Sequence, residues 1–263
     1  MSTNEYIKEL LSHEEYSFSF QELQDNVPKT EASLKSELAR LVKKNEIVNL
    51  RRGFYLILPP RYSKSGFLPV QLYIDKLFGY LKRDYYLGFY SAAKFHGASH
   101  QQTQKDYIIT QFPQILDIKK SKYDLLFYTI SEWPANNIEI RKSDAGYFKI
   151  SSPSLTAVDI IHYQKKIGGL NRILSVLEEL THEISYEDVE KLLKWYPNKS
   201  SLQRFGYFLE MFNADKKISD LVYENINSSK FYPVLLNSDT KQKAGTVSNR
   251  WKVDINIKLE SDL

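Results

Sequence analysis

Basic residues that could contact a nucleic acid are concentrated in one short stretch of this 263-residue sequence. Residues 29–52 contain seven Lys or Arg residues and three acidic ones, whereas residues 1–28 contain one Lys and six acidic residues. Local positive charge of this kind neutralises the phosphates of a nucleic acid. The formal net charge of the whole chain is only +4, which is too small to indicate such a partner by itself, so the distribution of charge carries the argument.

The first group of these residues is predicted to lie on a helix that begins at Thr30. Its apolar residues have the spacing of a single buried stripe and are Leu34, Leu38, Leu41 and Val42. The opposite face then presents small residues beside Arg40 and Lys43. Small side chains let a helix backbone approach base edges, and Arg can donate two hydrogen bonds to guanine. The alternative interpretation is an ordinary solvated helix face.

The second group lies at the tip of a predicted hairpin. Residues 46–50 and 54–58 have strand-like patterns, with Arg51-Arg52-Gly53 between them. A three-residue loop that ends in Gly is typical of a type I turn followed by a bulge, because Gly enters the left-handed region without a steric cost. A basic pair at such a tip favours DNA binding over simple solvation. The candidate DNA-contacting residues are Lys29, Thr30, Ser33, Ser36, Arg40, Lys43, Lys44, Arg51 and Arg52.

Two further helices are predicted before these elements. Ser2 with Glu5, and Ser19 with Glu22, have the spacing of capping boxes, so one helix begins after Ser2 and a short one spans residues 20–26. The order of three helices followed by a hairpin is that of a winged helix-turn-helix, in which the third helix enters the major groove and the hairpin tip contacts the backbone or the minor groove.

The expected fold class is α+β with two domains. Residues 1–60 form the winged helix-turn-helix domain, and residues 61–67 are a linker because Pro59-Pro60 and the small polar residues after it do not continue a strand. Residues 68–263 form a larger mixed α/β domain with a helical section. Its predicted elements are helices at 70–83 and 91–95, strands at 106–110, 123–129, 137–141 and 147–150, helices within 169–226, and a terminal strand at 251–259 that returns to the sheet.

Signals of catalysis are weak. Asp117-Ile-Lys119 has the form used by metal-dependent nucleases but lacks an identifiable second carboxylate, and His96 with His100 lacks a third metal ligand. Gly168-Gly169 precedes an apolar-striped helix and is interpreted as a turn rather than a phosphate-binding loop. We therefore expect no enzyme activity, no metal and no cofactor. A nuclease, or another nucleic-acid-processing enzyme targeted by a winged helix, is the alternative function.

Composition limits where such a protein acts. The chain is 42% apolar and 26% charged and contains no Cys, which excludes disulfides, thiolate nucleophiles and cysteine-bound zinc. It has no basic and apolar leader at its start and no apolar run long enough to span a membrane. We expect a folded cytoplasmic protein without a membrane partner.

Four segments carry a resemblance to a known family. They are the region ending in Arg52-Gly-Phe-Tyr55, then Tyr85-Tyr-Leu-Gly-Phe-Tyr-Ser-Ala-Ala-Lys-Phe-His-Gly97, Ser154-Leu-Thr-Ala-Val-Asp-Ile-Ile161 and Asn249-Arg-Trp-Lys-Val-Asp-Ile-Asn256. In this order they resemble the AbiEi antitoxin family of type IV toxin–antitoxin systems, which act in abortive infection, a form of phage defence. The resemblance implies a winged-helix repressor of its own operon that binds inverted repeats in promoter DNA. It also implies a carboxy-terminal domain that counteracts a cognate nucleotidyltransferase toxin without needing a stable complex.

Basic pairs also occur outside residues 29–52. They lie at Lys119-Lys120, Arg141-Lys142 and Lys165-Lys166, in a remainder that holds 28 basic and 23 acidic residues from position 53 onward. Such pairs either contact nucleic acid or are solvated loops, and solvated loops are the commoner case.

Overall fold

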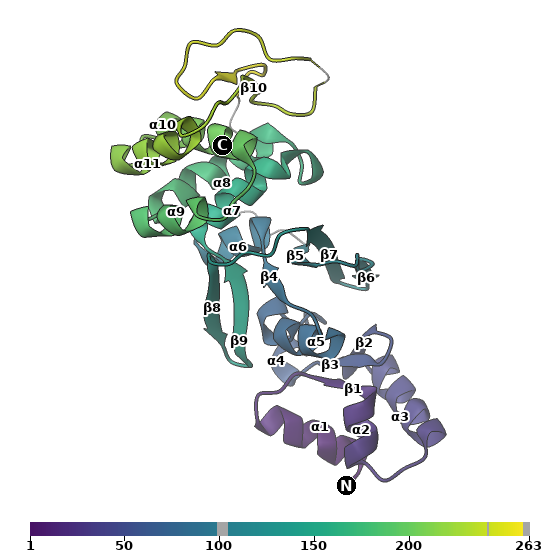
Figure 1. Ribbon diagram of the computed structural model, residues 1–263. Coiled ribbons are helices and arrows are strands. Elements are labelled where there is room, and N and C mark those ends of the chain that lie inside the picture. The colour runs from purple at the N-terminus through teal and green to yellow at the C-terminus, as the bar shows by residue number, and fades with distance from the viewer. Residues whose placement is uncertain (99–104, 241, 260–263) are drawn as a thin grey trace. The chain divides into compact units, whose positions relative to one another are not determined.

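The computed structural model describes residues 1–98, 105–240 and 242–259 (Figure 1). The chain divides into two compact units. The first contains Met1–Tyr86, Gln104–Ser131 and Ile140–Lys149, and the second contains Leu87–Thr103, Glu132–Glu139 and Ile150–Leu263. The chain contains both helices and several sheets, which agrees with the predicted α+β class.

The first 57 residues contain three helices and a small sheet. In chain order these elements are α1 Thr3–Ser12, β1 Ser17–Ser19, α2 Phe20–Asn26, α3 Glu31–Lys43, β2 Ile47–Arg51 and β3 Phe54–Ile57. Both predicted capping boxes are present: Ser2 Oγ accepts from Glu5 N at 3.3 Å, and Ser19 Oγ accepts from Glu22 N at 3.1 Å. The sheet is antiparallel with the order β1-β3-β2, and β1 is a strand that the sequence patterns did not indicate.

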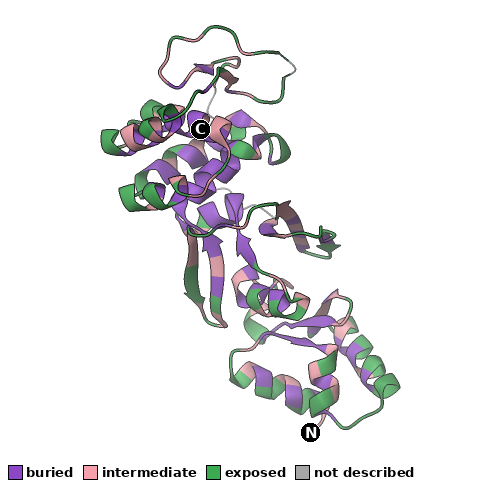
Figure 2. Cartoon of the chain, viewed as in Figure 1, coloured by how far each residue is buried: buried purple, intermediate pink, exposed green. Residues whose placement is uncertain are grey.

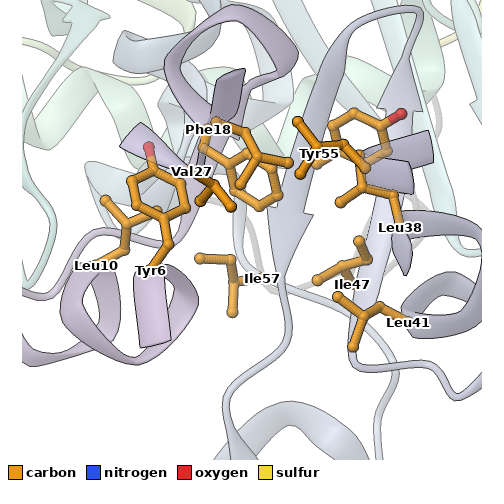
Figure 3. Close-up of a cluster of buried hydrophobic side chains, with 11 residues drawn as sticks. Tyr6, Leu10, Phe18, Val27, Leu38, Leu41, Ile47, Tyr55 and Ile57 are labelled. Carbon is orange, nitrogen blue, oxygen red and sulfur yellow. The ribbon is translucent and has the colours of Figure 1, made fainter. Parts of the chain in front are cut away.

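Apolar side chains from all of these elements form one core (Figure 3). Phe18 of β1 stacks on Tyr55 of β3 with ring centroids 5.4 Å apart, and Tyr6 of α1 meets Phe18 edge-on at 5.9 Å. Leu34 and Leu38, from the predicted stripe of α3, are almost fully buried in this core. Burial of apolar surface of this extent is the main force that holds α3 in place and fixes which of its faces is exposed.

Residues 60–82 of the first unit continue as helices. They form α4 Pro60–Ser63, the 3₁₀ turn η1 Val70–Leu72 and α5 Ile74–Leu81. The single helix predicted for residues 70–83 is therefore interrupted at Tyr73, whose backbone angles of φ −143° and ψ −12° are not helical. Pro60 at the start of α4 has the fixed φ that suits a first helical turn, so a short helix begins there and extends into the predicted linker as far as Ser63.

A six-stranded mixed sheet follows, with the order β6-β7-β5-β4-β9-β8. Its strands are β4 Tyr85–Leu87, β5 Asp106–Gln111, β6 Ile118–Lys120, β7 Tyr123–Ile130, β8 Ile138–Ser143 and β9 Gly146–Ser151. β5 pairs parallel with β7, in the register Asp106 to Leu125, while β6 pairs antiparallel with β7. The four predicted strands of this region are present to within two residues, whereas the short strands β4 and β6 were not predicted.

The second unit is largely helical. Its helices are α6 Phe89–Phe95, α7 Pro153–His162, the 3₁₀ turn η2 Gln164–Lys166, α8 Leu170–Glu183, α9 Tyr186–Leu193, α10 Lys199–Met211 and α11 Lys216–Asn227. Every residue of α7 from Pro153 to Ile161 is buried, because α6, α8, α9 and α10 all pack against it (Figure 2). A helix that is buried on all sides lies at the centre of such a layer, and α7 also buries polar side chains there, those of Ser154, Thr156 and Asp159.

The terminal strand prediction for residues 251–259 is wrong. Only β11 Val253–Asp254 is a strand, and it pairs parallel with β10 Val234–Leu235 rather than with the six-stranded sheet. The alternating pattern has another cause, because Trp251 is fully buried against α10 and Lys252 takes a left-handed φ of 52° that interrupts an extended chain. No helix among the described residues has both the length and the apolar character needed to cross a membrane.

Candidate nucleic-acid interface

The exposed face of α3 presents four of the nine predicted DNA-contacting residues together. Thr30 caps the helix, its Oγ1 accepting from Ser33 N at 3.3 Å, and so fixes where the helix begins. Four side chains are exposed, opposite the buried leucines: Ser33, Ser36, Arg40 and Lys43. The stripe predicted from the sequence therefore leaves these four side chains accessible on one helix.

Some basic residues of this region already form ion pairs with carboxylates, and others do not. Lys29 Nζ lies 2.6 Å from Glu37 Oε1, and Thr3 Oγ1 donates to the other carboxylate oxygen of Glu37 at 2.5 Å. The hydrogen bond from Lys29 is the largest cause that lowers the pKa of Glu37, so this carboxylate stays ionised and keeps Lys29 paired. Lys44 Nζ lies 3.9 Å from Glu46 Oε1.

Four cations of the candidate interface have no ion pair among the described residues. Among the residues that the structure describes, no carboxylate lies within ion-pair distance of Arg40, Lys43, Arg51 or Arg52. Exposed ion pairs contribute little energy but do reduce the charge that a residue can offer to phosphate. The charge count in the sequence did not distinguish these four residues from Lys29 and Lys44, because Glu37 lies eight positions from Lys29 and only the fold brings them together.

The hairpin tip is tighter than predicted. Arg51 belongs to β2 and pairs with Phe54, so that Arg52 and Gly53 alone form the turn. The pairing shifts register between Asn49 and Arg51, as expected for a bulge, and Gly53 has a φ of +76°. Phe20 N, at the start of α2, donates to Gly53 O at 2.8 Å and ties the tip to the helices.

A groove of about 720 Å³ lies beside this tip, within the first unit. Its walls carry three carboxylates, those of Glu15, Glu22 and Asp75, together with Lys76 and aromatic rings that include Phe54 and Tyr80. Lys76 pairs with Glu15 and lies 3.8 Å from Glu22 Oε1. The sequence patterns did not indicate this groove, because its walls come from residues more than 50 positions apart.

The residues considered for catalysis have structural contacts. Asp117 Oδ1 accepts from Phe127 N at 2.9 Å, and Lys119 lies opposite Asp124 in the β6–β7 pair. His96 is buried, with Nε2 2.7 Å from Ser151 O, while His100 lies outside the described residues. No group of three metal-ligating side chains occurs within residues 1–98, 105–240 and 242–259.

A polar cluster that sequence reasoning missed lies in the second unit. His162 Nδ1 is 3.1 Å from Ser201 Oγ and 3.1 Å from Asn198 Nδ2. Desolvation lowers the pKa of His162, and the positive charges of Arg204 and Lys166 act in the same direction. The ring lies at the end of α7, and its hydrogen-bond contacts are with hydroxyl and amide groups at the start of α10.

Comparison with known proteins identifies the carboxy-terminal part. Residues 86–211 match the family described as the AbiEi antitoxin C-terminal domain. A crystal structure of the RV2827C protein from Mycobacterium tuberculosis is similar, with a TM-score of 0.67 and 15% identity over 94% of this chain and 89% of that chain, which shows a shared fold. No curated protein sequence matches this chain.

The matched domain begins in β4 and ends with α10, so it contains most of the mixed sheet and the buried helix α7. It supports a role as the antitoxin of a toxin–antitoxin system, a family that is typically regulatory rather than catalytic. The match over residues 86–211 confirms the resemblance to the AbiEi antitoxin family that was found in the sequence.

Proposed function

We propose that this protein is a type IV antitoxin that also represses its own operon. Residues 1–60 act as a winged helix-turn-helix on inverted repeats in the promoter, residues 61–67 connect, and residues 68–263 counteract a cognate nucleotidyltransferase toxin without a stable complex. We place this activity in the cytoplasm, as part of an abortive response to phage. The family of the carboxy-terminal domain supports the antitoxin role.

One observation carries the DNA-binding part of this proposal. Four unpaired cations, Arg40 and Lys43 on α3 and Arg51 and Arg52 at the hairpin, lie on the two elements that a winged helix presents to DNA. The small side chains of Ser33 and Ser36 on the same face of α3 would let the backbone approach base edges.

The residues then have different roles. Arg40, in the middle of the exposed face, reads a base in the major groove, while Lys43, Arg51 and Arg52 contact phosphates. Three hydroxyl side chains lie close to the same groove, those of Thr30, Ser33 and Ser36. A hydroxyl can donate to a phosphate oxygen, and it can donate to or accept from a base edge. Lys29 and Lys44 contribute less, because Glu37 and Glu46 already neutralise them in part.

The test is fluorescence anisotropy of the full chain on a duplex from its own promoter and on a scrambled duplex of equal length. Arg40→Ala should weaken promoter binding by about 1–3 kcal/mol and scrambled-duplex binding much less, whereas Lys43→Ala should weaken both equally. Lys29→Ala is the matched control, since it removes a cation that is already paired. Equal losses for Arg40→Ala on both duplexes would contradict the base-reading role, and wild-type protein without promoter preference would contradict repression.

The antitoxin part has its own test. Cells that express the toxin encoded beside this gene should grow when the full chain is supplied from an independent promoter. Rescue by the Arg40→Ala variant at the wild-type level would separate neutralisation from DNA binding. Failure of the wild-type chain to rescue would contradict the antitoxin role.

A further inference from the structure

Helix α5 contacts the hairpin tip although it lies outside both the predicted DNA-binding domain and the matched family domain. It spans Ile74–Leu81, and within the first unit it packs on β1. Its Lys76 pairs with Glu15, near the end of α1, and lies close to Glu22 of α2. One turn later, Tyr80 reaches the hairpin itself.

Tyr80 makes two contacts with the tip. Its hydroxyl donates to the backbone oxygen of Arg52 at 3.2 Å, and its ring lies 5.4 Å from the ring of Phe54. A Cβ atom at Gly53 would lie 2.7 Å from the Tyr80 oxygen, which is closer than real Cβ atoms come to any neighbour. The left-handed φ of Gly53 favours Gly at this position, and a Cβ atom there would also displace the Tyr80 hydroxyl from Arg52 O.

Both carbonyl groups of the turn are thus held by groups from outside the hairpin. Phe20 N donates to Gly53 O at 2.8 Å from one element, and the Tyr80 hydroxyl donates to Arg52 O from another. A two-stranded hairpin is marginally stable by itself, and a loop tip is a region where motion concentrates. Fixing the backbone before binding lowers the entropy that Arg51 and Arg52 lose when they contact phosphate.

We propose that Tyr80 is a positioning residue for the hairpin tip, so that the DNA-binding domain of residues 1–60 depends on α5 for the placement of this tip. This inference rests on the proposed DNA-binding function. Tyr80 does not itself contact DNA in this scheme, and it acts through the backbone of Arg52.

The first experiment measures the tip without DNA. Tyr80→Phe removes one hydrogen bond and keeps the ring beside Phe54. Hydrogen exchange of a peptide that covers the tip, in the full chain, should become about fivefold faster, as expected for loss of one hydrogen bond. Tyr147→Phe is the matched control, because Tyr147 lines the same groove and its hydroxyl has no hydrogen-bond partner among the described residues.

The second experiment is a double-mutant cycle on promoter DNA with Tyr80→Phe and the double variant Arg51→Ala, Arg52→Ala. In the wild-type background Tyr80→Phe should lower affinity about fivefold, and in the alanine background it should have almost no further effect. A general loss of stability would instead lower affinity in both backgrounds. Thermal melting of all variants checks that they are folded.

The outcomes separate the two proposals. Unchanged exchange at the tip in Tyr80→Phe overturns the positioning role, whatever the protein binds. Faster exchange with equal affinity losses in both backgrounds also overturns it, because Tyr80 would then act elsewhere. Wild-type protein that does not bind promoter DNA contradicts the proposed function, while the exchange experiment still decides whether Tyr80 holds the tip.

Discussion

The packing of Trp251 on α10 predicts an unusual effect of a glycine-to-alanine substitution. Gly206 lies inside α10, where Ala is ordinarily preferred by about 0.5–1 kcal/mol because it restricts the unfolded chain. In this structure a Cβ atom at Gly206 would overlap three atoms of the Trp251 ring. The ring cannot move away freely, because it is fully buried and Nε1 donates to Glu210 Oε2 at 2.6 Å.

The magnitude follows from these contacts. Tyr223 meets the Trp251 ring edge-on at 5.7 Å, and the Arg250 guanidinium lies 4.9 Å from it, so shifting the ring disturbs several partners. Overpacking of a well-packed core costs about 1–3 kcal/mol. Because displacement also weakens the Glu210 hydrogen bond, which is worth about 1 kcal/mol, we expect Gly206→Ala to lower the free energy of unfolding by about 1–3 kcal/mol after the helix preference is included.

The assay is urea unfolding followed by tryptophan fluorescence and far-UV circular dichroism. Gly79→Ala is the matched control, since Gly79 also lies in a helix but nothing surrounds its Cβ position, and it should raise stability by up to about 1 kcal/mol. Combining Gly206→Ala with Trp251→Ala should remove most of the penalty of Gly206→Ala. An increase in stability for Gly206→Ala, equal to that for Gly79→Ala, would refute the packing argument.

Three further predictions concern the tip, the polar cluster and catalysis. The double variant Arg51→Ala, Arg52→Ala should reduce the slope of log affinity against log salt by roughly 1.8, since each of two phosphate contacts contributes about 0.9, and an unchanged slope in a salt titration would mean that the tip does not contact the DNA backbone. The pKa of His162 is lower in the folded protein than its value of 6.5 in the unfolded chain, so the unfolded chain binds the proton more readily. The contribution of His162 to the free energy of unfolding should therefore be fully present above pH 6.5 and should decrease as the pH falls towards the folded-state pKa. The measurement is the free energy of unfolding in urea between about pH 5 and 7.5, the range in which His titrates. Its dependence on pH should be weaker in His162→Gln than in the wild-type protein, and an equal dependence in the two proteins would contradict the prediction. Asp117→Ala should lower stability, because it removes the hydrogen bond that Asp117 accepts from Phe127 N. We expect no nuclease activity with magnesium or manganese in either the wild-type protein or this variant. Metal-dependent cleavage that disappears in Asp117→Ala would contradict the non-enzyme interpretation.

Local signals in the sequence predicted local structure well. The capping boxes at Ser2 and Ser19 are present with both of their hydrogen bonds, because this motif depends on residues only three positions apart. The stripe of α3 was predictable for a similar reason, since its period alone defines which face is buried. The candidate residues on that face are therefore exposed as expected.

Features that depend on distant partners were not predictable. The alternation of residues 251–259 resembles a strand, but the burial of Trp251 depends on the space left by Gly206, 45 positions earlier. Strand β1 has only three residues and exists because β3 pairs with it. The pairing of Lys29 with Glu37, which separates paired from free cations in the interface, also appears only once α3 has packed.

The support of the hairpin tip also depends on residues beyond the proposed DNA-binding domain. Pro59-Pro60 is a local signal for the end of a strand, and β3 does end at Ile57, but such a signal contains no information about which later residues pack on that strand. Tyr80 and Lys76 are placed on α5 by a helical pattern of their own, and their contacts with Arg52, Phe54 and Glu15 arise only in three dimensions. Because these contacts hold the hairpin tip and the end of α1, a fragment that stops at residue 60 retains the basic residues but loses the groups that fix their backbone. The presence of the contacting residues and the ability to present them are therefore encoded in different parts of the chain.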